Sequence, residues 1–278
     1  MCWNKELIQE IIKQARREDL AWGDITTDNL IESGRKSEGI ILAKEKGMIA
    51  GLPVAELVFQ QYDPRIEYLP CCEDGQTITA GQELVKLSGP TAAILRGERV
   101  ALNFLQRLSG IATQTNHYVK LLRDYPVRVV DTRKTTPTLR VLEKYAVRVG
   151  GGYNHRMSLA DAVLIKDNHI KAAGGIANAI SILKKRLPHT VKIEIEVQDL
   201  PGVEEALAAG AEIIMLDNMG IEEMKKAVRL IAGKAIVEAS GGITDQTVRE
   251  VAATGVDIIS VGALTHHIRA LDLSLNLL

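Results

Sequence analysis

Basic and acidic side chains follow short β-branched runs in the second half of this 278-residue sequence. Arginine and lysine bind carboxylates and pyrophosphate, whereas carboxylates hold Mg²⁺ or accept hydrogen bonds from sugar hydroxyls. The basic side chains are Arg133, Lys134, Arg156 and Lys166, with His155 beside them, and the acidic ones are Glu196 and Asp217. Each basic residue taken alone is more typical of a solvated charge or a structural ion pair. Their clustering after successive runs indicates a site for an anionic substrate.

A second pattern, rich in glycine, follows the last two runs. Ser240-Gly241-Gly242 precedes a helix that we expect to open at Thr244, and Gly262-Ala263 follows the next run. Late strand-to-helix loops of α/β barrels often hold a phosphate through backbone N–H groups, which a side chain would obstruct. The pattern therefore predicts a phosphate site, with two ordinary strand-to-helix turns as the alternative.

Lys166 and the histidines also admit other interpretations. A lysine that ends a barrel strand is how a Schiff-base aldolase presents its amine, but an aldolase does not require the long cationic stretch at 131–156. The sequence contains neither of the spacings HxxxH and HxH that would suggest a zinc site. Structural or substrate-contacting histidines are therefore favoured.

The runs that carry these residues alternate with helical stretches after Pro126. Such alternation predicts βαβ units, a parallel sheet and right-handed crossovers, and six units suit a barrel of the TIM type with a reduced number of strands. All strand ends of a barrel open onto one face, so the polar residues would meet in one pocket. A doubly wound open sheet is the alternative, but no GxGxxG fingerprint supports it. The runs are residues 127–131, 161–166, 191–197, 212–217, 235–240 and 257–262.

The first half of the chain has a different pattern of apolar and turn residues. Residues 4–20 show helical apolar spacing, and residues 38–90 alternate short apolar runs with turn residues around a helix at 53–61. Residues 91–124 indicate one long helix or two consecutive ones. We therefore expect a small α+β domain with a mostly antiparallel sheet, and the chain length also favours two domains or a barrel with an attachment.

Charge and composition argue against a protein that binds nucleic acid, spans a membrane or is secreted. Lys and Arg number 34 and Asp and Glu 35, so no long-range field recruits nucleic acid or an anionic membrane surface. The charged first twenty positions argue against a signal peptide, and no uncharged run reaches the roughly 18 residues of a spanning helix. Cys2, Cys71 and Cys72 lack CxxC spacing and fit a reducing compartment, with a reactive thiol as the alternative. A cytoplasmic location is expected.

Several motifs together resemble the quinolinate phosphoribosyltransferases in order and spacing. DTRKTTP at 131–137, NHR at 154–156 and LIKDNH at 164–169, with the Ser-Gly-Gly strand end, are specific in combination. The resemblance covers essentially the whole chain. One departure is Thr138, because the family usually has glycine after the proline of DTRKTTP. Further similar segments are residues 23–27, 98–103, 108–113, 216–218, 238–242 and 261–265.

The resemblance implies an activity and an architecture. The activity is transfer of phosphoribosyl from phosphoribosyl pyrophosphate to quinolinate with decarboxylation, which gives nicotinate mononucleotide, pyrophosphate and CO₂ in de novo NAD biosynthesis. The architecture is α/β: a reduced TIM-like α/β barrel with an N-terminal α+β open-sandwich domain. The expected domains are residues 1–113 with a linking helix, residues 114–270 and a C-terminal closing segment, residues 271–278. The resemblance also implies a homodimer in which the N-terminal domain of one subunit covers the other's barrel mouth.

The resemblance further implies a role for each candidate site residue. The quinolinate carboxylates are assigned to Arg133, Arg156, His155 and Lys166, with Arg99 arriving from the partner subunit. Lys134 and Lys166 would also face the pyrophosphate. Glu196 and Asp217 would hold the ribose hydroxyls and Mg²⁺. The 5′-phosphate is assigned to Ser240, Gly241, Gly242, Gly262 and Ala263, and Thr132 lines the same strand end. The expected catalytic residues are Lys134, Lys166, Glu196 and Asp217.

Two other functions compete with this one. A phosphoribosyltransferase acting on a monoacid such as nicotinate, without decarboxylation, needs fewer cations than Arg133, Arg156 and the partner's Arg99 supply. A catalytically inactive barrel that senses phosphorylated metabolites would keep the glycines of the phosphate site but lose some of the acidic or basic site residues. None of those residues is lost in this sequence.

Overall fold

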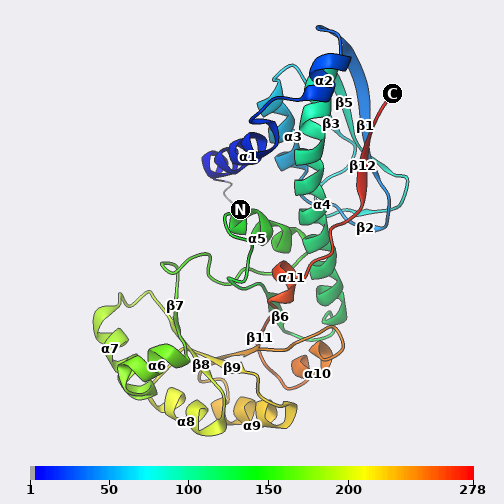
Figure 1. Ribbon diagram of the computed structural model, residues 1–278. Coiled ribbons are helices and arrows are strands. Elements are labelled where there is room, and N and C mark those ends of the chain that lie inside the picture. The colour runs from blue at the N-terminus through cyan, green and yellow to red at the C-terminus, as the bar shows by residue number, and fades with distance from the viewer. Residues whose placement is uncertain (1–3) are drawn as a thin grey trace. The chain divides into compact units, whose positions relative to one another are not determined.

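The computed structural model describes residues 4–278, which form two compact units (Figure 1). The first unit contains the chain up to Asn116 together with residues 135–151 and 264–278, and the second contains residues 117–134 and 152–263. Cys2 lies outside the described residues. No helix among the described residues is long and apolar enough to cross a membrane.

The first unit combines helices with an antiparallel sheet of strand order β12-β1-β5-β3. In Figure 1, α1, α3 and α4 lie on one side of this sheet. The helices are α1 (Lys5–Leu20), α2 (Ile25–Leu30), α3 (Leu52–Tyr62), α4 (Thr91–Leu121) and α5 (Arg140–Val149). The strands are β1 (Lys36–Ala43), β2 (Gly47–Met48), β3 (Glu67–Pro70), β4 (Thr77–Ile78), β5 (Glu83–Pro90) and β12 (Leu273–Leu277). The helices expected at 4–20 and 53–61 are confirmed, and 91–124 forms one helix rather than two.

The core of the first unit forms where helical and strand periodicities meet. Ile8 and Ile12 lie on one face of α1 and are fully buried, as a 3.6-residue repeat requires. In β1, Ile41 and Ala43 are fully buried while Leu42, between them, is partly exposed, because successive strand residues point to opposite faces. Sequence alternation thus places one face of the sheet under the helices.

The closing segment expected at 271–278 forms β12. It pairs antiparallel with β1, so that Ile41 lies opposite Leu275. The sheet of the first unit therefore contains a strand that comes after the whole second unit in sequence.

The second unit contains a parallel sheet of strand order β6-β11-β10-β9-β8-β7. The strands are β6 (Arg128–Val130), β7 (Val163–Ile165), β8 (Ile193–Val197), β9 (Ile213–Asp217), β10 (Ile236–Ser240) and β11 (Ile258–Ser260). The helices are α6 (Asp167–Ala173), α7 (Ile176–Arg186), α8 (Leu200–Ala208), α9 (Ile221–Ile231) and α10 (Val248–Ala252), and α11 (Ala263–His266) follows. Each of the six predicted runs contains one of these strands.

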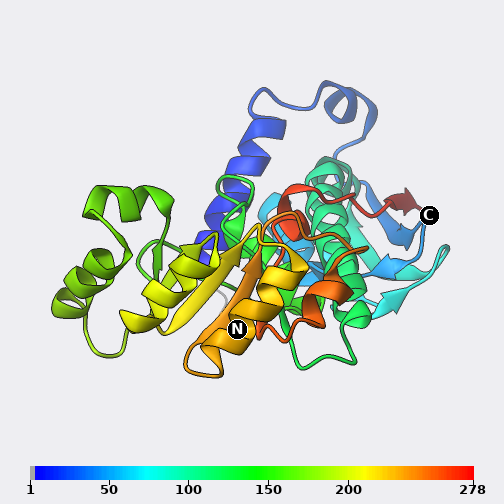
Figure 2. The same cartoon turned by 90° about the horizontal axis from the view of Figure 1, so that it is seen from below.

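The strand order is the cyclic order of a barrel opened at one seam. Chain order runs unbroken from β7 to β11, and β6 then pairs with β11, as closure of a barrel requires. Within the described residues β6 and β7 do not pair with each other, and Tyr153 instead forms a parallel bridge with Val130 of β6. Figures 1 and 2 show α8 and α9 along the outer side of the sheet. The predicted fold class, a reduced TIM-like α/β barrel with an N-terminal α+β domain, is confirmed.

Candidate active site

The inner face of the barrel sheet carries carboxylates. Glu194 and Glu196 alternate in β8 with Ile193, Ile195 and Val197, so the two glutamates share the face that points away from the apolar residues. The strand register places Glu196 level with Met215 of β9, which is level with Glu238 of β10. Side chains of three neighbouring strands therefore meet on one polar face.

His155 lies against two buried glutamates. Its Nε2 is 3.2 Å from Oε2 of Glu194 and 3.7 Å from Oε2 of Glu238, whose side chains are 4% and 2% exposed. Burial and the negative charge of Glu194 together raise the pKa of Glu238 to about 7, and His155 and Ser260 oppose the shift. Two buried carboxyl groups this close do not both ionise readily, so Glu238 holds its proton near neutral pH.

The NHR segment is anchored to the end of β6 by Asp131. Oδ1 of this fully buried carboxylate accepts the backbone N–H of His155 at 2.9 Å, and Oδ2 accepts Nδ2 of Asn154 at 2.5 Å. The backbone N–H of Arg156 donates to Nδ1 of His155 at 2.7 Å. The segment is thus fixed by the strand end and by its own histidine ring.

Two guanidinium groups lie together at this end of the barrel. Burial lowers the pKa of Arg156, and the charge of neighbouring Arg133 lowers it further, while Glu194 and Asp161 act in the opposite direction. Nη1 of Arg156 donates to the carbonyl of Ala162 at 3.1 Å, which leaves its other donors for a ligand or for further protein contacts. A cation pair of this kind suits a doubly charged anion.

Lys166 and Glu196 form an ion pair across neighbouring strand ends. Nζ of Lys166 is 2.7 Å from Oε2 of Glu196, and the lysine side chain is about half exposed. The backbone N–H of Lys166 donates to Nδ1 of His169 at 3.0 Å, which fixes the start of α6. The amine therefore stands at the mouth of the barrel with a carboxylate at hand.

Asn218 and Gly241 form the adjacent corner of the site. The backbone N–H of Asn218 donates to the carbonyl of Ser240, and its Nδ2 donates to Oδ2 of Asp217 at 3.0 Å. Gly241 has a φ of +93°, and a Cβ there would lie 2.5 Å from Cγ and 2.8 Å from Nδ2 of Asn218. Only glycine fits this position without displacing the asparagine.

The helix expected to open at Thr244 begins later, at Val248. The prediction was wrong because Thr247 completes a local turn: its hydroxyl accepts the N–H of Thr244 at 3.0 Å, and Val248 donates to the Thr244 carbonyl. Any phosphate at this strand end would therefore meet the backbone of the glycines rather than the start of a helix. Gly262 and Ala263 follow β11 in the corresponding position.

Thr132 and Lys134 extend the end of β6. The backbone N–H of Lys134 donates to Oγ1 of Thr132 at 3.0 Å, and the lysine is exposed. This local turn directs the chain after the strand. Thr138, where the family usually has glycine, has a φ of +69°, a conformation that strains a β-branched residue.

Arg99 belongs to the first unit, on α4, and is exposed. Burial raises the pKa of adjacent Glu98, and the Arg99 charge opposes that shift. Among residues 4–278 no acidic side chain pairs with Arg99 within 4.0 Å, so its guanidinium is not held by an ion pair of its own subunit.

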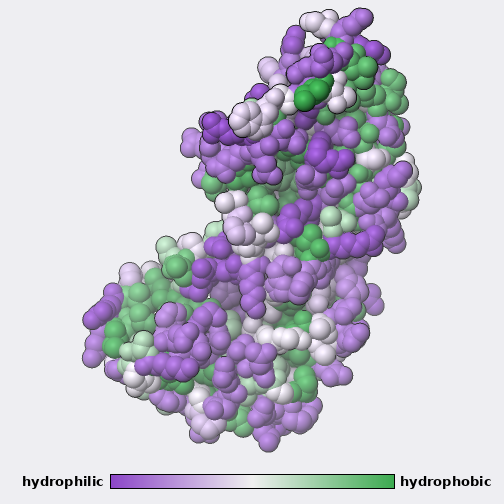
Figure 3. Space-filling model, in the orientation of Figure 1, coloured by the Kyte–Doolittle hydropathy of each residue, from purple (hydrophilic) through white to green (hydrophobic). Residues whose placement is uncertain are grey.

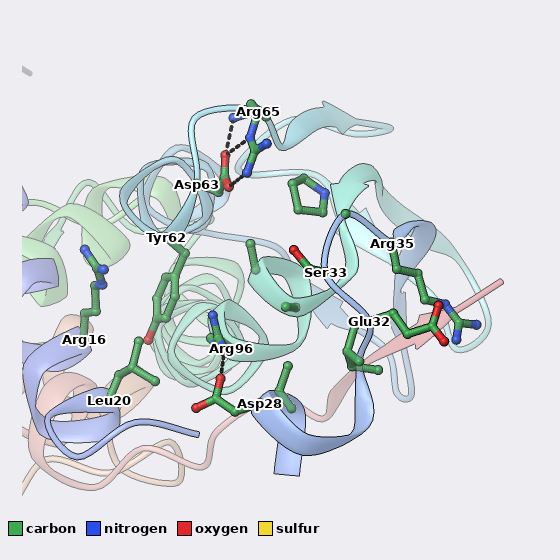
Figure 4. A pocket seen from close by; sticks show the side chains of 16 residues that line it. Arg16, Leu20, Asp28, Glu32, Ser33, Arg35, Tyr62, Asp63, Arg65 and Arg96 are labelled. Atoms are coloured by element: carbon green, nitrogen blue, oxygen red, sulfur yellow. Dashed lines mark hydrogen bonds and ion pairs between the residues drawn. The ribbon is translucent and has the colours of Figure 1, made fainter. Parts of the chain in front are cut away.

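A hollow of about 440 Å³ in the first unit is a rival candidate (Figure 4). Its cations are largely satisfied inside the protein. Arg96 pairs with Asp28, and Arg65 pairs with Asp63 at 2.6 Å. Arg16 donates to the carbonyl of Gln61 at 2.8 Å. Because Arg65 and Arg96 are already paired with carboxylates, the hollow offers less to an anion than its arginines alone would suggest.

Glu194 and Glu238 were not among the predicted site residues, although both contact His155. Glu194 is the second residue of β8 and Glu238 the third residue of β10, so neither lies at the strand end where the predicted residues gather. The available indication was a charged residue at an alternating position of a strand with otherwise apolar residues, since buried charges require partners. The roles assigned to the other site residues remain predictions.

Two sequence models of one family match the chain. Residues 111–276 match the model described as quinolinate phosphoribosyl transferase, C-terminal domain, and residues 24–109 match the N-terminal domain of the same family.

Known proteins resemble the chain over nearly its full length. A Synechocystis sp. protein named probable nicotinate-nucleotide pyrophosphorylase (carboxylating) is 47% identical over 274 residues, which cover 98% of this chain and 92% of the relative. A Bacillus subtilis protein of the same name is 42% identical over 270 residues, which cover 97% and 93%. The structure of the nicotinate-nucleotide pyrophosphorylase from Francisella tularensis superposes with a TM-score of 0.95 at 41% identity, covering 100% of this chain and 98% of that chain.

Proposed function

We propose, on the premise that this chain belongs to the quinolinate phosphoribosyltransferase family, that it transfers phosphoribosyl from phosphoribosyl pyrophosphate to quinolinate. Loss of CO₂ accompanies the transfer, and the products are nicotinate mononucleotide and pyrophosphate, in de novo NAD biosynthesis. The relatives from Synechocystis and Bacillus subtilis, both named as carboxylating pyrophosphorylases, support this reaction.

The observation that carries the proposal is the guanidinium pair at the barrel end. Arg133 lies close enough for its charge to lower the pKa of Arg156, and an anionic ligand would relieve this repulsion. A pyridine dicarboxylate supplies two negative charges, and each guanidinium can bind a carboxylate through paired hydrogen bonds. A monoacid such as nicotinate would compensate only half of the cationic charge.

The transfer step requires positioning and electrostatic stabilisation. The bond between ribose C1 and pyrophosphate breaks, and the ring nitrogen of quinolinate bonds to C1. Positive charge develops on the ribose and negative charge on the leaving group, to which we assign Lys134 and Lys166. Glu196 and Asp217 are assigned to the ribose hydroxyls, and the backbone of Gly241 and its neighbours to the 5′-phosphate.

Decarboxylation follows from the charge that transfer creates. The pyridinium ring accepts the electron pair of the breaking bond between C2 and its carboxylate, CO₂ leaves, and C2 then takes up a proton. No nucleophilic side chain is required. Cations near C2 orient the carboxylate, but too strong an interaction in the ground state would oppose its loss.

Mg²⁺ fits the carboxylates at the ends of β8 and β9. Oxygen ligands suit this ion, which usually keeps several waters and binds substrate phosphates. Glu196 is level with Met215, two residues before Asp217, so both carboxylates lie at one edge of the sheet. Oε2 of Glu196 pairs with Lys166, so Asp217 and the other Glu196 oxygen would hold the ion. When bound, Mg²⁺ neutralises charge on the pyrophosphate.

We further propose a homodimer in which Arg99 enters the partner's site. Arg99 is exposed and forms no ion pair within 4.0 Å among the described residues, as we expect of a residue donated to another subunit. The first unit also exposes large apolar side chains: Trp22 is 98%, Ile25 82% and Leu30 72% accessible. Figure 3 shows hydrophobic side chains where Figure 1 places α2. Clustered exposed apolar residues are typical of an interface.

Subunit mixing tests the shared site. Arg99→Ala and Lys166→Ala subunits should each be inactive, but random reassortment makes about half of the dimers mixed, with one intact site of two. Activity should therefore return towards about a quarter of wild type. Confirmed exchange of subunits without recovery would place Arg99 outside its partner's site.

The cellular context stays a prediction from composition. We expect a cytoplasmic enzyme because its cysteines fit a reducing compartment. We expect it to bind neither nucleic acid nor membrane because its charges nearly cancel.

A product assay tests the reaction. Purified protein with quinolinate, phosphoribosyl pyrophosphate and Mg²⁺ should yield pyrophosphate, CO₂ and nicotinate mononucleotide in equal amounts. Nicotinate should be a poor substrate, since the second carboxylate contact is missing. Turnover of nicotinate at comparable efficiency would favour the monoacid enzyme, and phosphate-ligand binding without turnover of either acid would favour the sensor.

A further inference from the structure

His155, Glu194 and Glu238 form a buried cluster, and the two glutamates have no role in the proposed reaction. The three residues offer one imidazole and two carboxylates within 4.8 Å of one another. Oε1 of Glu238 is buried and has no hydrogen-bond partner among the described residues. Because an unpaired buried oxygen costs free energy, the cluster needs a physical explanation.

The tautomer of His155 disfavours a metal at this cluster. Nδ1 accepts the backbone N–H of Arg156 at 2.7 Å and therefore carries no proton. A neutral imidazole then has its proton on Nε2, the nitrogen that faces Glu194 and Glu238. A protonated Nε2 donates a hydrogen bond and cannot ligate a cation. Glu194 thus accepts a hydrogen bond from the imidazole, and Glu238 lies beside the same nitrogen at 3.7 Å.

We propose that Glu194 and Glu238 are positioning residues for the acid-binding site: they hold His155 as the Nε2-protonated tautomer, whose Nδ1 in turn fixes the backbone of Arg156. This inference rests on the proposed function and adds the means by which the barrel interior sets the quinolinate contact. Strands β8 and β10 supply the glutamates, and Asp131 after β6 holds the same segment through the His155 N–H. Residues from three strands thereby fix the backbone of the residue that carries one of the two guanidinium groups.

Glu238 must be neutral for this arrangement. Glu194 from β8 and His155 from the NHR segment are the titratable groups that face it, and Ser260 of β11 lowers its pKa slightly. The Met215 side chain of β9 is apolar. Ionisation of Glu238 has two possible results, a second negative charge near Arg156 or a second proton on His155. The second proton would occupy Nδ1 and break the bond from Arg156 N–H. Either result weakens dicarboxylate binding.

The pH dependence of quinolinate KM tests the role of Glu238. In the wild type KM should rise by up to about tenfold between about pH 6 and pH 8, as a group with pKa of about 7 loses its proton. In Glu238→Gln, which cannot ionise, this rise should be absent. Glu204→Gln, an exposed substitution on α8, is the matched control and should keep the wild-type profile. An unchanged profile in Glu238→Gln would overturn the proposal.

Replacement of Glu194 should change the KM of quinolinate much more than the KM of phosphoribosyl pyrophosphate. Glu194→Gln removes the charged acceptor of His155 Nε2, so quinolinate KM should rise about tenfold while the KM of phosphoribosyl pyrophosphate changes less than about twofold. A general loss of folding would not raise the KM of one substrate more than that of the other. A lower melting temperature of the variant would reveal such a loss. Equal effects on the two substrates would contradict a role in acid binding.

A measurement without substrate separates this inference from the proposed reaction. Nitrogen NMR of labelled imidazoles, assigned with His155→Gln, should show His155 as the Nε2-protonated tautomer near pH 6. An Nδ1-protonated ring, or identical titration of His155 in wild type and Glu238→Gln, would refute the positioning role. Absence of quinolinate turnover would instead refute the proposed function, and the tautomer measurement would then decide the inference alone.

Discussion

Replacement of Gly241 by alanine perturbs one corner of the site in two separable ways. A φ of +93° costs an alanine roughly 1–2 kcal/mol, reduced by the lower entropy of the unfolded chain. The new Cβ also meets the side chain of Asn218, at 2.5 Å from Cγ, and overpacking adds about 1–3 kcal/mol. We therefore expect a total loss of about 2–4 kcal/mol in the free energy of unfolding.

Gly233 provides a matched control in the same unit. Its φ is +77°, and an added Cβ would meet no atom within 4 Å, so Gly233→Ala reports backbone strain alone, about 1 kcal/mol. Urea unfolding followed by circular dichroism compares the two variants. In the background of Asn218→Gly, the cost of Gly241→Ala should fall to that of Gly233→Ala. Equal costs in the wild-type background would refute the packing of Asn218 against Gly241.

The same substitution should affect one substrate selectively. A displaced Asn218 no longer donates to Oδ2 of Asp217, and the glycine backbone assigned to the 5′-phosphate is crowded. The KM of phosphoribosyl pyrophosphate should therefore rise more than the KM of quinolinate. A selective rise for quinolinate would contradict the assignment of this corner to the phosphoribosyl group.

Four other predictions test the site and the fold. Alanine at Arg133 or at Arg156 should lower kcat/KM for quinolinate at least about 100-fold without changing the melting temperature, because each loses a charged hydrogen bond; near-normal efficiency would show the assignment to be wrong. Arg107→Met should cost about 3–5 kcal/mol in urea unfolding, since it leaves a fully buried glutamate without its cation, and wild-type stability would count against that buried pair. Thr138→Gly should stabilise the protein by about 1 kcal/mol in the same assay by relieving a φ of +69°; a lower stability would contradict the strain. Since the pKa of Glu238 is raised from 4.5 to about 7, the native state binds the extra proton in that interval, so stability should fall by at most about 3 kcal/mol as pH rises through it. Glu238→Gln should flatten this pH dependence of stability, and an unaltered slope would exclude Glu238 as its source.

The strands and their polar ends could be predicted because both depend on local patterns. Alternating β-branched runs mark the strands, and parallel strands bring their carboxyl ends to one edge. That rule alone anticipates the contact of Lys166 with Glu196, which are 30 residues apart in the sequence. It also places Asp217 level with Ser240.

The buried charges could not be predicted in the same way. Glu143 and Lys144 on α5 are fully buried, although adjacent charges in a helix are typical of an exposed face. Arg107 pairs with Glu143 at 2.6 Å from another helix, 36 residues away, and no local pattern reports such a partner. The contact of His155 with Glu238 is likewise decided by tertiary packing.

The β12 strand has a consequence for the order of events during synthesis. A ribosome makes residues 273–277 only after every strand of the second unit, yet these residues complete the sheet of the first. The nascent chain can therefore form its barrel while β1 still presents an unpaired edge, the kind of edge that invites pairing with other chains. A fusion or deletion at the carboxyl end would accordingly impair the unit that is translated first.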